Sequence, residues 1–176
     1  MILKTFELHK INDNAIFYLL YGKNDGLKAE CISEILNKNN EKIYNYDEKQ
    51  IKDEIEPFYE NILSDSLFES NKVIIVNRAS DKICEIIKDL IDRNITNIKI
   101  IINAGILDTK SKLRSIFEKR KDLICIPTYP DNNETLSKLT YNFFKKENIS
   151  ISQENINMIV EKCNGDRSNL KNELNK

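Results

Sequence analysis

The sequence has few of the residues that build metal sites and disulfide frameworks. It contains one histidine, His9, and four cysteines that lie far apart and form no Cys-x-x-Cys pair. Structural metal sites need several such ligands at close spacing, and disulfide-rich folds need a denser set of cysteines. We therefore expect no metal, no cofactor and no disulfide. The four cysteines are Cys31, Cys84, Cys125 and Cys163.

Long hydrophobic runs and an excess of charge are also missing. No apolar run approaches the roughly 18–20 residues that cross a bilayer. Residues 1–5 lack the basic and then apolar pattern of a secretory signal. The formal net charge is −1, so the global electrostatics give no indication of a nucleic acid partner. These absences predict a cytoplasmic protein that does not interact with a membrane.

Short apolar runs alternate with helical patterns along most of the chain. Hydrophobic residues form 40% and charged residues 31% of the 176 residues, which is typical of one globular domain with a small appendage. Most of the runs are near-continuous in Ile, Val or Leu, as in strands covered on both faces. The alternation predicts an α/β fold with a parallel five-stranded sheet and flanking helices. The expected strands are Ile16–Leu20, Lys42–Tyr46, Val73–Val76, Ile98–Ile102 and Leu123–Ile126.

The pattern changes after the last expected strand. Residues 127–133 read Pro-Thr-Tyr-Pro-Asp-Asn-Asn, and only helical patterns follow them. We expect an α/β domain at residues 1–127 and a small helical lid domain at 128–176, whose last helix has no stop signal before the chain ends. Asp108 in the first domain and Ser152 in the lid are predicted to cap helices, and Asp166 is predicted to start the last helix.

A glycine-containing turn joins the first expected strand to the first helix. Residues 22–29 read Gly-Lys-Asn-Asp-Gly-Leu-Lys-Ala, whereas a working phosphate loop reads Gly, four residues, Gly-Lys-Ser/Thr. Gly22 and Lys28 match this pattern, but Leu27 replaces the second glycine and Ala29 replaces the hydroxyl that binds magnesium. The pattern predicts a degenerate phosphate loop without catalytic residues. A turn with a purely structural role is the other interpretation.

A parallel sheet with such a loop, followed by a small helical lid, is similar to the layout of an AAA+ module. The resemblance implies an acidic pair at the end of a later strand, yet Asn77 and Arg78 follow the run Val73–Val76. Arg167 is similar to the nucleotide-sensing arginine of the lid, but it lies one position early relative to the Gly-x-x-Arg spacing of that arginine. Asn103 occupies the place of a polar sensor, but as a strand-ending turn residue it needs no such role.

Three further segments carry a family resemblance: residues 17–22, 65–77 and 164–174, of which the Ser-Leu-Phe sequence before the strand at residue 73 is the most specific. They resemble the clamp-loader delta family of bacterial DNA polymerase III. The ATP-binding relatives in that complex carry a four-cysteine zinc cluster, which is absent from this sequence. These 176 residues do not include the helical collar domain of the family, so we expect either a fragment of a longer protein or an unusually short member.

The resemblance implies a protein that binds the sliding clamp and helps to open it for loading onto primed DNA, without hydrolysing ATP. In the family a Leu-Phe pair enters an apolar pocket of the clamp, so Ser66, Leu67 and Phe68 are the expected clamp-binding residues. The implied partners are the sliding clamp (beta), the gamma/tau and delta prime subunits and, through the complex, primed DNA. Judged from the pattern alone, Leu67 and Phe68 would cover a sheet edge.

Two other functions remain open at this point. One is a small nucleotide-binding transferase that holds phosphate at residues 22–28. No catalytic set of nucleophile and base accompanies that loop. The other is a nucleic-acid-binding module that uses the basic residues between Lys110 and Lys121.

Overall fold

The chain forms one parallel sheet with helices on both faces, followed by a group of helices. The computed structural model describes residues 1–11, 15–36, 42–63, 72–93, 95 and 98–176. The strands are β1 (Phe17–Gly22), β2 (Lys42–Asp47), β3 (Lys72–Ala79), β4 (Ile98–Ala104) and β5 (Ile124–Thr128). The helices are η1 (Thr5–Lys10), α1 (Asp25–Leu36), α2 (Glu48–Asp53), α3 (Ile55–Leu63), η2 (Asp81–Ile83), α4 (Cys84–Asp92), α5 (Lys112–Lys119), α6 (Asn133–Lys146), α7 (Gln153–Lys162) and α8 (Arg167–Leu174). The predicted fold class is confirmed.

The strand order of the five-stranded sheet is β2-β3-β4-β1-β5, and every pairing is parallel. β1 lies between β4 and β5, with Leu19 opposite Ile102 on one side and Cys125 on the other. The turn after β1 therefore lies in the middle of the carboxyl edge of the sheet. The strand order changes direction at this position, because β4 pairs with one side of β1 and β5 with the other. Ligands of open α/β sheets bind at such positions.

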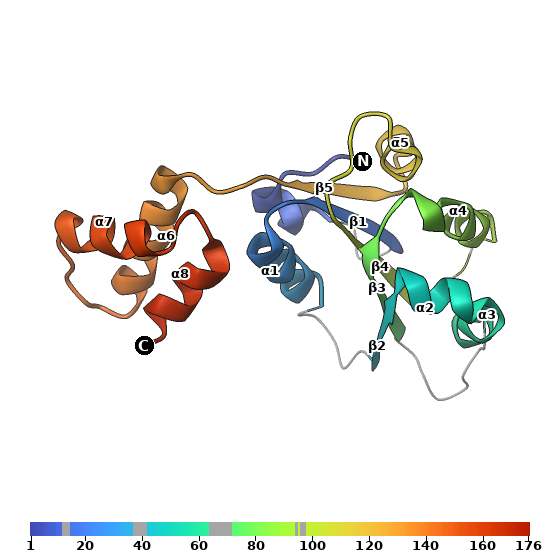
Figure 1. The fold of residues 1–176 in the computed structure, drawn as a ribbon, viewed down its shortest axis with the longest axis horizontal. Helices are drawn as coiled ribbons and strands as arrows, with labels where there is room; N and C mark the ends of the chain where they lie inside the picture. Colours follow the sequence, from blue (N-terminus) through green and yellow to red (C-terminus); the bar gives the residue numbers. More distant parts are fainter. Residues whose placement is uncertain (12–14, 37–41, 64–71, 94, 96–97) are drawn as a thin grey trace.

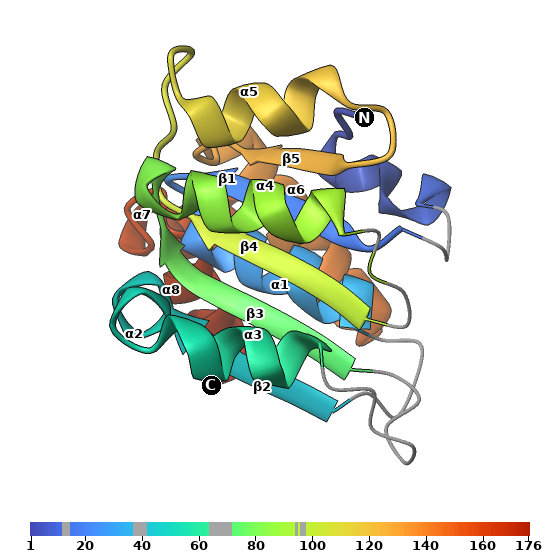
Figure 2. The same ribbon diagram turned by 90° about the vertical axis from the view of Figure 1, so that its right-hand side faces the viewer.

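Each face of the sheet packs against its own set of helices (Figure 2). Residues of α2 to α5, such as Phe58, Ile87 and Phe117, form one core with Leu19 and neighbouring strand residues. Residues of η1 and α1, such as Leu8 and Cys31, form a second core on the opposite face. This coverage on both faces explains why the central strands are almost continuously apolar.

The C-terminal helices α6, α7 and α8 form the lid, which has a hydrophobic core of its own (Figure 1). Leu136, Ile156, Val160 and Leu170 meet there and are all buried. An extended segment connects β5 to α6, and α8 lies beside α1. The predicted boundary between residues 127 and 128 stays a prediction, and β5 ends at Thr128.

Local signals located two of the three predicted helix starts correctly. Ser152 caps α7, as predicted, and the last helix, α8, starts directly after Asp166; both side-chain oxygens accept hydrogen bonds from backbone N–H groups. The predicted cap at Asp108 is wrong, because the Ser111 side chain caps α5 instead. Asp108 accepts a hydrogen bond from Lys110 N within the preceding turn. In the part of the chain that the structure describes, no helix has the length and hydropathy to span a membrane.

Candidate functional site

The turn that resembles a phosphate loop begins with a glycine that the packing requires. Gly22 ends β1 with φ of +139°, and a Cβ atom there would lie 2.1 Å from the carbonyl oxygen of Thr128 in β5. Its N–H donates to the carbonyl of Gly105, at 2.9 Å. Only glycine fits this conformation and this space, so the contact with β5 explains Gly22 without a phosphate.

Asn24 connects the turn to the segment that leads into the lid. Its side-chain oxygen accepts from Leu27 N at 3.0 Å and so caps α1. Its amide nitrogen donates to Tyr129 O at 3.0 Å and to the Asp131 carboxylate at 2.8 Å. All polar atoms of this buried side chain are thus engaged within the chain.

Lys28, which matches the lysine of a working phosphate loop, is bound by the protein itself. Its side chain is 5% exposed, and its ammonium lies 2.8 Å from an oxygen of Asp25. It also donates to the Ala104 carbonyl at the end of β4, at 2.8 Å. The Asp25 carboxylate adds a negative charge where a phosphate would need positive charge.

The two positions that depart from the phosphate-loop pattern, Leu27 and Ala29, have side chains without a ligand-binding group. Leu27 is half-buried and packs against the core formed with η1 and α1, so its side chain contributes to that core. Ala29 is an exposed residue of α1. It has no oxygen with which to bind a metal ion. The turn keeps the position of a phosphate loop and lacks its metal ligand.

Amide and arginine side chains lie at the carboxyl ends of β3 and β4, where the AAA+ resemblance implies an acidic pair after β3 and a polar sensor after β4. Asn103 donates to Asn77 at 3.0 Å, which joins the two strands. Arg78 has φ of +55° and forms an ion pair with Asp47 at the end of β2. The Arg78 guanidinium is 79% exposed and would repel a divalent cation. We expect no magnesium binding at this edge.

The described residues contain no cluster of three or more His, Cys, Asp or Glu side chains that could hold a metal. The four cysteines are all free and buried. Burial raises the pKa of Cys31 to about 11 and that of Cys125 to about 12. Because only the thiolate is a strong nucleophile, neither group is activated for covalent chemistry.

A group of four residues, here called the Arg167 cluster, joins the lid to the α/β domain. Arg167, the first residue of α8, donates through Nε and Nη2 to the two oxygens of Asp131, at 2.8 and 2.6 Å. Its Nη1 donates to Glu30 of α1 at 2.7 Å. Asn24 donates to the same Asp131 carboxylate and completes the cluster. Every member of the Arg167 cluster is therefore bound to another member.

The charges of the Arg167 cluster stabilise one another. The hydrogen bonds that Arg167 donates to Asp131 and Glu30 raise its pKa above the usual value, although burial opposes this. Burial alone would raise the pKa of Asp131, but the hydrogen bonds from Arg167 and Asn24 outweigh it, and the pKa falls below its usual value. The side chains of Arg167 and Asp131 are only 10% and 4% exposed. The pair is a partly desolvated, bidentate ion pair.

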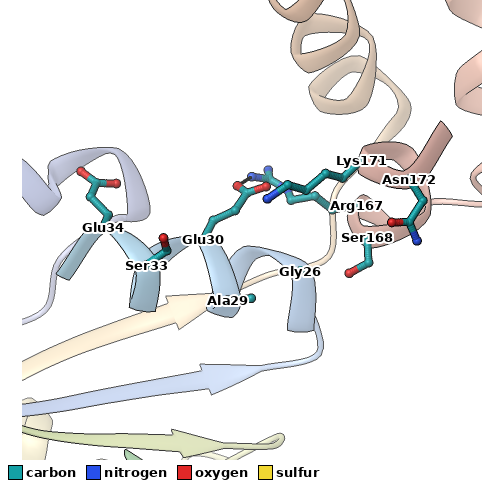
Figure 3. A pocket seen from close by; sticks show the side chains of 9 residues that line it. All are labelled: Gly26, Ala29, Glu30, Ser33, Glu34, Arg167, Ser168, Lys171 and Asn172. Atoms are coloured by element: carbon teal, nitrogen blue, oxygen red, sulfur yellow. Dashed lines mark hydrogen bonds and ion pairs between the residues drawn. The ribbon is translucent and has the colours of Figure 1, made fainter. Parts of the chain in front are cut away.

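A groove of about 510 Å³ lies beside the Arg167 cluster, between α1 and α8 (Figure 3). Arg167 extends from α8 toward Glu30 on α1 in this view, and Gly26 faces the first turn of α8. The groove is lined by Gly26, Ala29, Glu30, Ser33, Glu34, Arg167, Ser168, Lys171 and Asn172. It contains groups of both charge signs and therefore has no clear preference for an anion.

Sequence reasoning selected Arg167 but missed the residues that bind it. Asp131 lies in the segment that was interpreted only as a connection, and Glu30 lies on a helix interpreted only as core. Their separations from Arg167 are 36 and 137 residues, so no local spacing reveals the cluster. The off-register position of Arg167 was the one available signal.

The expected clamp-binding residues Ser66, Leu67 and Phe68 lie outside the described residues. The nearest described neighbours are Leu63, the last residue of α3, and Lys72, the first residue of β3. Because all strands run in parallel, Lys72 marks the amino edge of the sheet, opposite the edge that carries the turn after β1.

Two of the basic residues near α5, both arginines, make ion pairs within the domain. Arg114 contacts Glu118 at 2.8 Å, and Arg120 contacts Asp122 at 2.7 Å. Both arginines are thereby partly neutralised. This arrangement suits a solvated helix surface better than a nucleic acid interface.

The strand order and the carboxyl edge together define the fold class. A parallel sheet with this strand order, a glycine turn after β1 and following helices is the AAA+-like fold that the sequence predicted. No family model matches the chain, and no curated protein matches its sequence. Solved structures do match its fold.

Among these structures, the Bacillus subtilis DNA clamp loader delta protein (YqeN) superimposes with a TM-score of 0.63 and 18% identity. The match covers 97% of this chain and 54% of that one, so the chain spans about half the length of that protein. The Holliday junction branch migration motor RuvB of Thermotoga maritima matches with a TM-score of 0.56 and 13% identity, over 97% of this chain and 56% of that one. Domain III of the replication initiation protein DnaA of the same organism has a TM-score of 0.52 and 13% identity, with coverages of 96% and 77%.

Proposed function

We propose that this chain is a delta-type subunit of a bacterial clamp loader, which binds the sliding clamp and helps to open it for loading onto primed DNA. It does so without hydrolysing ATP. The observation that carries the proposal is that two cations of an AAA+-like fold are bound within the chain: Lys28 by Asp25 and the Ala104 carbonyl, and Arg167 by Asp131. The fold is similar to that of a clamp loader delta protein. A replication-related AAA+-like role is supported by the neighbouring structures.

The chemistry of the carboxyl edge supports a role in binding instead of hydrolysis. Phosphoryl transfer needs a metal ion, a cation for the phosphates and a residue that positions water. Ala29 and Asn77 replace the metal-binding groups, and Lys28 is bound to Asp25 and the Ala104 carbonyl. We propose accordingly that residues Gly22, Leu27, Lys28 and Ala29 form a turn that binds no MgATP.

The proposed clamp-binding residues are Ser66, Leu67 and Phe68, on the connection between α3 and β3. Burial of each large apolar side chain in a pocket contributes about 1.5–3 kcal/mol, so the pair supplies about 3–6 kcal/mol. Micromolar affinity requires about 8 kcal/mol. Leu67 and Phe68 would therefore act as anchors, and neighbouring residues would supply the remaining affinity.

Titration against a purified bacterial sliding clamp tests these residues. We expect the double variant Leu67→Ala, Phe68→Ala to lose measurable clamp binding while its circular dichroism spectrum stays unchanged. The matched control is Ile106→Ala, Tyr129→Ala, which removes two exposed apolar side chains near the opposite edge of the sheet. Equal clamp affinity for the wild type and the first variant would refute the assignment.

Calorimetry with MgATP tests the second part of the proposal. We expect no heat of binding at micromolar nucleotide and no release of phosphate by the purified chain. Micromolar MgATP affinity would contradict the proposal and favour the nucleotide-binding transferase. Clamp binding and nucleotide binding are separate measurements, so either part can fail alone.

The remaining partners are proposed with the same function. The gamma/tau and delta prime subunits would assemble with the full-length protein, and primed DNA would be reached through that complex. Copurification of the full-length protein with these subunits tests the assembly, and an isolated full-length subunit that never associates with them would contradict it.

A further inference from the structure

The lid contacts the α/β domain through the ion pairs of Arg167. Arg167 opens α8, Asp131 lies in the segment between β5 and α6, and Glu30 lies in the second turn of α1. The guanidinium donates to both carboxylates at 2.6–2.8 Å. One arginine thus connects the lid, the connecting segment and the domain below.

The same contact reaches the turn after β1. Asp131 accepts from Asn24 at 2.8 Å, and Asn24 caps α1 through its other side-chain atom. The carboxylate of Asp131 therefore receives donors from the lid and from the turn at once. A phosphate bound at this place would be expected to receive donors from the same two sides.

A second, uncharged contact lies next to the first. A Cβ atom added to Gly26 would lie 2.8 Å from Ser168 Oγ and 3.1 Å from Ser168 N. The first turn of α8 therefore packs directly on the first turn of α1, and a larger residue at position 26 would separate them. This contact is independent of the ion pairs.

We propose that the Arg167 cluster is a latch that holds the lid against the α/β domain without nucleotide. The Asp131 carboxylate takes the place of an anionic ligand between the turn and the lid arginine. The lid then keeps one orientation whether or not nucleotide is present. This proposal concerns the chain alone and does not depend on clamp binding.

Burial gives the latch its strength. Asp131 is 4% exposed, and loss of Arg167 would leave its charge with Asn24 as its remaining partner in the cluster. An uncompensated buried charge is strongly unfavourable, so the connecting segment would rearrange to expose Asp131 to water. The lid, attached through that segment, would then lose its fixed orientation.

Distance measurements between the two domains test the latch directly. Spin labels at Lys88→Cys on α4 and Glu161→Cys on α7 occupy exposed positions, whereas the native cysteines are buried. We expect the otherwise wild-type chain to show one narrow distance distribution by double electron–electron resonance, unchanged by MgATP. Arg167→Ala should broaden the distribution and shift it. A broad distribution without that substitution, or one that MgATP alters, would overturn the proposal.

Matched controls separate the latch from general destabilisation. Arg78→Ala removes an arginine that pairs with an aspartate inside the α/β domain and should leave the distribution narrow. Gly26→Ala should broaden the distribution with all charges retained, whereas Gly105→Ala, which has open space around it, should not.

The glycine variants keep the test decisive if Arg167→Ala does not fold. A narrow, unshifted distribution in Gly26→Ala would then refute the fixed contact between α1 and α8. If Arg167→Ala folds and keeps the wild-type distribution, the ion pairs do not hold the lid.

Discussion

Two arginine–aspartate pairs lie at the carboxyl edge of the sheet, and they differ in what surrounds them. Arg167 and Asp131 are 10% and 4% exposed and join two domains. Arg78 and Asp47 are 79% and 39% exposed and join neighbouring strands of one domain. Water screens the second pair and not the first. The comparison indicates that burial and connectivity, more than the residue types, decide which pair holds the structure together.

Arg167→Ala should have the largest effect on this comparison. We expect the free energy of unfolding to fall by about 3 kcal/mol, because Asp131 would keep a buried charge without its cationic partner. Urea-induced unfolding monitored by circular dichroism measures the change. A loss no greater than that of Arg78→Ala would remove the distinction between the two pairs.

Asp131→Asn should have a smaller effect that depends on pH. The neutral amide keeps the shape but loses the charged hydrogen bonds, so we expect a loss of about 2 kcal/mol at neutral pH. The pKa of Asp131 is lowered below its usual 3.8, so its stabilising contribution is present above pH 3.8 and is lost as the pH falls further. The stability difference between the two proteins, measured from unfolding curves in matched buffers, should therefore be constant from pH 7 to about pH 4 and begin to shrink as the pH falls below 3.8 toward pH 3. A difference that stays constant over this range would contradict the assignment.

Glu30→Gln should weaken the Arg167 cluster only slightly. Glu30 is 40% exposed, and Arg167 keeps its bidentate contact with Asp131 when the Glu30 charge is removed. We expect a loss of about 1 kcal/mol by urea unfolding. An effect as large as that of Arg167→Ala would show that Glu30, and not Asp131, is the main partner.

Arg78→Ala should have the smallest effect. The pair with Asp47 is exposed, and alanine leaves the positive φ of residue 78 as unfavourable as arginine does. We expect a change of less than about 0.5 kcal/mol in the free energy of unfolding, and a smaller one still at high salt. A loss comparable to that of Asp131→Asn would mean that exposure is the wrong criterion for ranking the pairs.

Local patterns in the sequence were sufficient for the fold class and for most elements. Near-continuous apolar runs predicted the strands, because both faces of this sheet are covered, and the spacing of apolar residues predicted the helices between them. Side-chain capping by Ser152 and Asp166 was also predictable, because a cap acts over three residues. The cap at Asp108 was mispredicted, because an oxygen three residues further along the chain, on Ser111, was equally suitable.

The candidate site was predictable in position but not in its contacts. The glycine pattern located the turn after β1, and the missing hydroxyl at Ala29 followed from the sequence alone. The bonds of Lys28 to the Ala104 carbonyl and of Arg167 to Glu30 did not, since they join residues 76 and 137 positions apart. Only the pairing of β1 with β4 and the packing of α8 on α1 bring these groups together. Chemical composition and short-range periodicity thus define the elements and the absent catalytic groups, whereas the partners of each charge depend on how distant elements pack.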